Sequence, residues 1–239
     1  MICYVKNKLN KTMITQLLII LLFFTNLFSG INSEANLNGA WRSDDGVVIF
    51  SGNYFAYTAF TETEFIATYG GSWSLKGNSI ELSYEFHTEN AEKVGTTERR
   101  AIDISKNSMI LDGFNFNRID DGTPGKLAGT WLFSNRMRNE ELGTPRSADN
   151  PRKTMKILSG TRFQWIAYNV ETKEFMGSGG GTYTTIDGKY TENIDFFSRD
   201  NSRVGASLEF DFERKDNDWH HKGLSSKGDP MYEIWSLRE

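Results

Sequence analysis

The sequence has only one cysteine among its 239 residues, and this scarcity excludes several ways of stabilising a chain. Cys3 lies ahead of the first apolar segment, whereas a lipoprotein signal needs its cysteine after that segment. We therefore expect the mature chain to carry no disulfide, no lipid anchor and no zinc site built on thiolates. Its stability in an oxidising compartment must then come from packing.

Basic clusters and recognisable catalytic motifs are also missing. No run of five or more Lys or Arg occurs, and the net charge of -4 becomes -6 once the +2 of residues 1–35 is removed. Such a surface repels phosphate backbones, so we expect no nucleic-acid partner. No Gly-x-Ser-x-Gly elbow is present, and carboxylates alone do not indicate a glycosidase. We expect neither an enzyme nor a cofactor.

Histidine is scarce as well. His220 and His221 are adjacent, and His87 is the third. Adjacent residues of a strand point to opposite faces, so the pair cannot chelate one ion. We interpret them as rim or surface residues and predict no metal site.

The N-terminus has the composition of a secretory signal peptide. Lys6, Lys8 and Lys11 precede an apolar run over residues 13–28, and small and polar residues follow up to Ala35. This order of charge, apolar centre and small-residue exit is typical of such signals. We predict a signal peptide over residues 1–35, a secreted or periplasmic protein, and no stable membrane insertion after cleavage. Two alternatives stay open: an uncleaved anchor, and a true start at Met13.

The remaining sequence is duplicated. Gly39-Ala40-Trp41 returns as Gly129-Thr130-Trp131, and the string FSGNYFAY of residues 50–57 returns as LSGTRFQW at residues 158–165. Gly70-Gly71-Ser72-Trp73 returns as Gly180-Gly181-Thr182-Tyr183. Order and spacing agree, so each copy is expected to form the same structural unit.

Both copies contain short strands and tight turns. Ile80, Leu82, Tyr84 and Phe86 alternate with polar residues, which is the pattern of a half-buried strand. Short consecutive strands favour a meander that closes on itself, because closure removes exposed edges. We predict an all-β protein with two tandem small antiparallel up-and-down β-barrels, over residues 36–121 and 126–239. The turn-rich residues 120–125 separate them, and the insertion at 139–152 predicts a surface loop over one barrel mouth.

A Gly-x-Trp on the first strand with an Arg on the last strand resembles the lipocalins and the wider calycin barrels. In those proteins the guanidinium lies across the indole and closes one barrel end. The resemblance implies the pairs Trp41 with Arg118 and Trp131 with Arg238. The chain is also similar to lipocalin-like secreted proteins of Bacteroidetes, including their Tyr-x-Glu strand, here Tyr190-Thr191-Glu192. It implies two tandem lipocalin-like barrels and no particular activity.

One residue departs from its repeat. Glu192 takes the place of Leu82 on the inward face, so its carboxylate must be paired or neutral. Arg162 and Arg238 are the candidate partners. The pair is either structural or an anchor for the polar end of a ligand, in a pocket lined by the aromatic residues Phe163, Trp165, Tyr183, Tyr190 and Trp219.

Two functions therefore remain. In the first, the second barrel rather than the first binds a small apolar or amphipathic molecule. In the second, the chain is a cell-envelope structural or protein-interaction module, with filled barrels and a patch of exposed aromatics that includes Tyr168 and Trp235. An eight-stranded barrel suits either, since its own side chains can fill it or one small ligand can.

Overall fold

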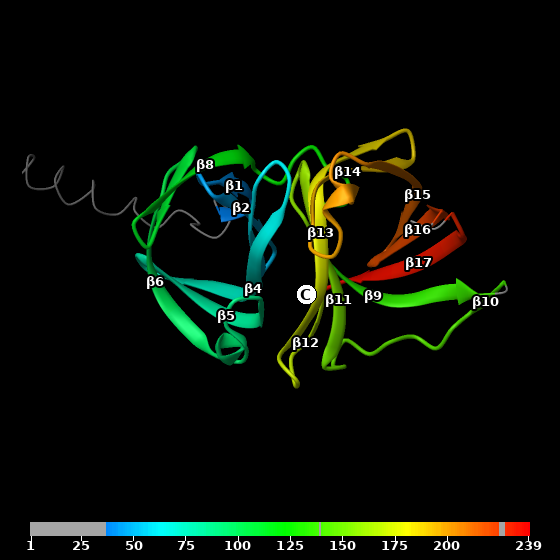
Figure 1. Cartoon of the computed structure of the whole chain (residues 1–239), viewed down its shortest axis with the longest axis horizontal. Helices are drawn as coiled ribbons and strands as arrows, with labels where there is room; N and C mark the ends of the chain where they lie inside the picture. The colour runs from blue at the N-terminus through cyan, green and yellow to red at the C-terminus, as the bar shows by residue number, and fades with distance from the viewer. Residues whose placement is uncertain (1–36, 139, 225–227) are drawn as a thin grey trace, which may run out of the picture. The chain divides into compact units, whose positions relative to one another are not determined.

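The computed structural model describes residues 37–138, 140–224 and 228–239, and it is an all-β protein (Figure 1). Two closed antiparallel barrels of eight strands each follow one another along the chain, as the sequence predicted. The expected signal peptide over residues 1–35 lies outside the described residues. Within the described ranges, no helix has the length and apolar character needed to cross a bilayer.

The first barrel is a meander in which every strand pairs with its sequence neighbours and the last strand pairs with the first. A single 3₁₀ turn, η1 (Ala91–Lys93), interrupts it. The strands are β1 (Gly39–Arg42), β2 (Gly46–Ser51), β3 (Tyr54–Phe60), β4 (Phe65–Lys76), β5 (Ser79–His87), β6 (Thr97–Ile104), β7 (Ser108–Leu111) and β8 (Phe114–Asp120).

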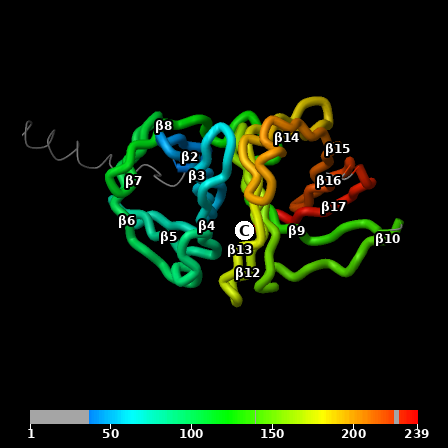
Figure 2. The backbone as a smooth tube through the Cα atoms, viewed as in Figure 1, coloured from blue at the N-terminus to red at the C-terminus, as the bar shows by residue number. Residues whose placement is uncertain are grey.

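The second barrel repeats this order, and Figure 2 follows its path from green to red. The short strand β10 (Glu141–Leu142) pairs only with β9 and lies in the inserted segment, and η2 (Asn201–Arg203) corresponds to η1. The barrel strands are β9 (Gly129–Arg138), β11 (Arg152–Leu158), β12 (Arg162–Asn169), β13 (Glu174–Ile186), β14 (Lys189–Phe197), β15 (Ser207–Lys215), β16 (Asp218–Leu224) and β17 (Pro230–Leu237).

The base of the first barrel is closed as predicted. The Arg118 guanidinium carbon lies 3.9 Å from the centroid of the fully buried Trp41 ring. The indole Nε1 of Trp41 donates to the Leu37 carbonyl at 2.9 Å. Gly39 is required because its φ is 122° and a Cβ would lie 2.1 Å from the Asp120 carbonyl oxygen. The Gly-x-Trp motif thus lets β1 approach the end of β8 and close the sheet.

The predicted pair of Trp131 with Arg238 is wrong. Trp131 keeps the buried indole and donates to the Leu127 carbonyl at 2.9 Å, but the guanidinium nearest its ring is that of Arg214, at 5.3 Å. A bulge in the pairing of β17 with β9 places Leu237 opposite Trp131. Arg238 instead lies over the ring of Tyr54 in the first barrel, at 4.0 Å.

The two barrels share a hydrophobic cluster on their outer faces. It explains why strand β11 is buried on both sides, with one face toward its own barrel and the other toward the first barrel. Polar contacts flank the cluster, since the Asp120 carboxylate accepts from Ser159 Oγ (2.8 Å) and from the amide nitrogen of Gly160 (2.9 Å). The cluster consists of Ala40, Val47, Ile49, Ala56, Phe86, Leu132, Met155, Ile157, Ile166 and Tyr168.

Candidate functional site

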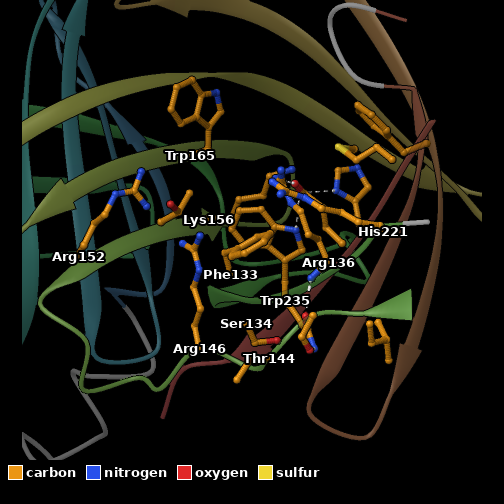
Figure 3. Close-up of a pocket in the computed structure, with 18 of the residues that line it drawn as sticks. Phe133, Ser134, Arg136, Thr144, Arg146, Arg152, Lys156, Trp165, His221 and Trp235 are labelled. Atoms are coloured by element: carbon orange, nitrogen blue, oxygen red, sulfur yellow. Dashed lines mark hydrogen bonds and ion pairs between the residues drawn. The ribbon is translucent and has the colours of Figure 1, made fainter. Parts of the chain in front are cut away.

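The second barrel is hollow at the end opposite Trp131. The cavity has a volume of about 780 Å³, and β9, β11, β17 and the inserted segment supply most of its lining (Figure 3). Glu141, Leu142, Thr144 and Arg146 of the inserted segment also line it, so the predicted position of this segment at a barrel mouth is confirmed. A cavity of this volume has room for one small organic molecule.

A buried ion pair crosses the cavity floor. Lys156 Nζ lies 2.7 Å from Glu192 Oε1, with side-chain exposures of 6% and 7%. The ammonium is enclosed by aromatic rings, at 5.0 Å from the centroid of Tyr190, 4.9 Å from Trp219 and 5.2 Å from Trp235. These rings attract the cation through their negative faces. The burial of Glu192 confirms the sequence prediction.

The partner predicted for Glu192 is wrong, because Lys156 rather than Arg162 or Arg238 pairs with it. Arg162 bonds to Asp195, and it lines a small space between the barrels with Phe60 and Phe196. Its side chain therefore lies outside the second barrel, because it belongs to the alternate face of β12.

The structure gathers the other residues of the predicted pocket in one aromatic cluster. Trp165 and Glu192 line the cavity itself, while four rings are buried beneath it and form the packed base of the barrel. These four are Phe163, Tyr183, Tyr190 and Trp219, none more than 2% exposed. The sequence thus located the barrel interior, although most of the predicted ligand-binding residues lie in its solid part.

His221 is the residue that sequence analysis judged wrongly. It is 2% exposed and lines the cavity, whereas its neighbour His220 points to the other face and contacts Tyr232 Oη at 2.7 Å. Neither ring nitrogen of His221 has a hydrogen-bond partner among the described residues, and the nearest carboxylate oxygen, from Glu233, is 4.0 Å away. Burial, assisted by the nearby Lys156 charge, lowers the pKa of His221 well below its ordinary value. The imidazole is therefore neutral.

The two repeats differ at the positions that matter here. Strand pairing places Trp41 opposite Val48 and Trp131 opposite Lys156, so Val48 and Lys156 occupy equivalent positions in the two repeats. The pairs of the following strands give the other equivalent positions in the same way. Three inward positions are apolar in the first barrel and polar in the second: Val48, Leu82 and Leu111 correspond to Lys156, Glu192 and His221. A fourth, Phe114, is 66% exposed in the first barrel and corresponds to Glu233. Only Glu192 was found from sequence; the aligned repeats carried the signal for the others.

Arginines surround the cavity mouth. Arg136 and Arg138 come from β9, Arg146 from the inserted segment and Arg152 from the start of β11. Partial burial and then the charges of Arg152, Arg136 and Arg138 lower the pKa of Arg146. Arg136 bonds to Glu233 at 2.7 Å, so Glu233 extends from the floor toward this rim. The sequence offered no local signal, because these arginines are spread over separate segments.

The first barrel is also hollow, which the sequence did not predict. Its cavity of about 740 Å³ is lined by Tyr57, Tyr69 and Tyr84. Arg100, one of the two arginines that line this cavity, is bonded to Asp112 at 2.5 Å, so these two charges compensate one another. Burial raises the pKa of Tyr69 above its ordinary value, so its hydroxyl stays protonated. This cavity lacks the buried ion pair and the unpaired imidazole of the second barrel.

We expect His221 to make the protein acid-sensitive. Its pKa is lowered in the folded state, so below about pH 6.5 the unfolded chain binds a proton that the native state does not, and stability falls by up to about 1.4 kcal/mol per pH unit. His221→Leu, which installs the residue of the first repeat, removes this slope. Urea unfolding of both proteins between about pH 7 and pH 5.5 measures the difference. Burial also lowers the pKa of His87, but this residue is present in both proteins, so its contribution cancels in the difference between their stabilities. Parallel curves would show that His221 takes up its proton as readily in the native state as in the unfolded chain, which contradicts a lowered pKa.

Compared with models of protein families and with curated proteins, the sequence matches none. Among the described residues, no group of three or more His, Cys, Asp or Glu side chains gathers as metal ligands would.

Proposed function

We propose that this chain is a secreted or periplasmic lipocalin-like protein that binds a small amphipathic molecule in its second barrel. The observation that carries the proposal is the neutral, buried His221, whose two ring nitrogens have no partner among the described residues and which lines a cavity of about 780 Å³. An unpaired buried polar group costs about 1–3 kcal/mol, and a bound ligand that hydrogen-bonds to it offsets this cost.

The rest of the lining supports the same function. Aromatic rings of Phe133, Trp165 and Trp235 offer apolar contact, and a small number of polar groups can fix orientation. Only this barrel places a buried ion pair and an unpaired imidazole at its cavity among the described residues, so we assign the ligand to it.

The alternative of a protein-interaction module with filled barrels is less well supported. Tyr168 is fully buried between the barrels and Trp235 is 3% exposed at the cavity floor, so the predicted exposed patch is not formed by these residues. Both barrels contain cavities rather than solid interiors throughout.

Native mass spectrometry of protein isolated from its own host tests the proposal. We expect a noncovalent adduct of a small molecule, lost on denaturation. Thr154→Trp places a bulky ring in the cavity lining and is expected to abolish the adduct. Thr184→Trp, on an exposed position of β13, is the matched control and is expected to retain it. An empty wild-type protein, or an adduct that persists in Thr154→Trp, would contradict ligand binding at this site.

A further inference from the structure

The mouth of the second barrel concentrates positive charge in a chain whose net charge is -4. Arg136, Arg138, Arg146 and Arg152 all line the cavity, and Figure 3 draws Arg146 and Arg152 on one side of it with His221 on the other. After burial, the charges of Arg152, Arg136 and Arg138 lower the pKa of Arg146, so these three cations repel the fourth. A cluster of like charges raises the free energy of the empty protein.

Besides Glu192, which pairs with Lys156, the carboxylates of Glu141 and Glu233 line the cavity and compensate the four arginines only in part. Arg136 has a carboxylate partner, Glu233, at 2.7 Å. For Arg138, Arg146 and Arg152, no carboxylate of the described residues lies within 4 Å. Arg100 and Arg238, in contrast, each bond directly to an acid. An anion at the mouth would supply the missing negative charge.

Aromatic packing prepares these guanidinium groups for a ligand. Those of Arg136 and Arg146 lie 5.2 Å and 4.8 Å from the centroid of the Phe133 ring. Phe133 in turn packs edge-on against Trp235, at 5.6 Å. Stacking restricts the long side chains, so less conformational entropy is lost when they bind. The same rings form a continuous apolar wall from the charged mouth down to the floor.

On the basis of the proposed function, we propose that the ligand is an amphiphile with an anionic head, a carboxylate or a phosphate monoester. Arg138, Arg146 and Arg152 bind the head at the mouth, and the apolar body lies along Phe133 and Trp235. The planar guanidinium fork suits both head groups, because each offers two oxygens in one plane. The cavity continues beneath the head-group site to His221, so a free inorganic anion would leave most of it unfilled.

Calorimetric titration with single-chain probes that differ only in their heads tests this assignment. Dodecanoate, dodecyl phosphate, dodecanol and dodecyltrimethylammonium are compared below their micelle concentrations, with inorganic phosphate as a headgroup-only probe. We expect both anionic probes to bind at least about tenfold more tightly than dodecanol, with an advantage that shrinks in high salt. We expect the cationic probe and inorganic phosphate to bind weakest.

Arginine variants locate the head. Arg146→Gln/Arg152→Gln is expected to weaken both anionic probes about tenfold or more and to leave dodecanol within about twofold. Arg99→Gln, an exposed arginine of the first barrel, removes one positive charge elsewhere and is expected to change neither. Equal binding of all four amphiphiles, insensitive to the double variant, would overturn the anionic head and leave the binding function standing. Binding of none, together with an empty protein in mass spectrometry, would overturn both.

Discussion

Replacing Glu192 with leucine lowers the free energy of unfolding by about 3–5 kcal/mol, because the buried ammonium of Lys156 loses its counter-charge. Leucine is the residue that the first repeat carries at this position, so its shape suits an inward site of this barrel. The loss therefore reports the charge left unpaired rather than a steric conflict. Urea unfolding followed by tryptophan fluorescence measures it.

The double variant Lys156→Met/Glu192→Leu separates these causes. It removes both charges and approaches the apolar pair Val48 and Leu82 of the first barrel. Replacing both members of a buried ion pair with apolar residues of similar volume is often neutral or stabilising, so we expect the double variant within about 1.5 kcal/mol of wild type. A single variant as stable as wild type, or a double variant as unstable as the single, would show that the pair does not have this role.

The fold could be predicted because its signals are local. Alternation along strands such as β5 specifies which face is buried, and Gly39 with Trp41 marks where the sheet closes. Because the sequence is duplicated, a strand assigned in one repeat can be checked against the equivalent strand of the other. Arg118 was found because it follows in the last strand of the same repeat and needs no contact from elsewhere.

The site was harder to predict because the sequences around its polar residues contain no recognisable motif. Lys156 lies between Met155 and Ile157, and the second half of β11 is buried on both faces, since it packs against the first barrel as well. Alternation alone therefore cannot assign its side chain. Comparison with Val48 does assign it, and the same comparison with Leu111 identifies His221 as buried.

The sequence of neither repeat indicated which residues contact the other repeat. Arg238 was assigned to Trp131 by analogy with Arg118, but the bulge in β17 shifts the register and Arg238 contacts the first barrel. Comparison of the two repeats predicts the contacts within each barrel. It does not predict the contacts between the barrels, because each repeat contributes different residues to them.

The interface itself gives the second large prediction. Arg238 donates two hydrogen bonds to Glu85, at 2.7 Å and 2.9 Å, and Tyr168 Oη donates to the same carboxylate at 2.5 Å. Burial alone would lower the pKa of Arg238, but its bonds to Glu85 raise it above its ordinary value. The side chains of Arg238 and Glu85 are 12% and 20% exposed, so the solvent screens this pair little.

Arg238→Ala is therefore expected to lower the free energy of unfolding by about 3–5 kcal/mol, because the Glu85 carboxylate stays behind without its cation. Arg203→Ala is the matched control, since Arg203 is exposed and lies 4.0 Å from Asp200, and it is expected to cost less than about 0.5 kcal/mol. In a double-mutant cycle with Glu85→Ala, the coupling between Arg238 and Glu85 should be about 2 kcal/mol or more. A coupling near zero, or equal effects of the two arginine variants, would mean that the apolar cluster alone holds the barrels together. A large coupling would instead show that the last residues of the second repeat fasten it to the first.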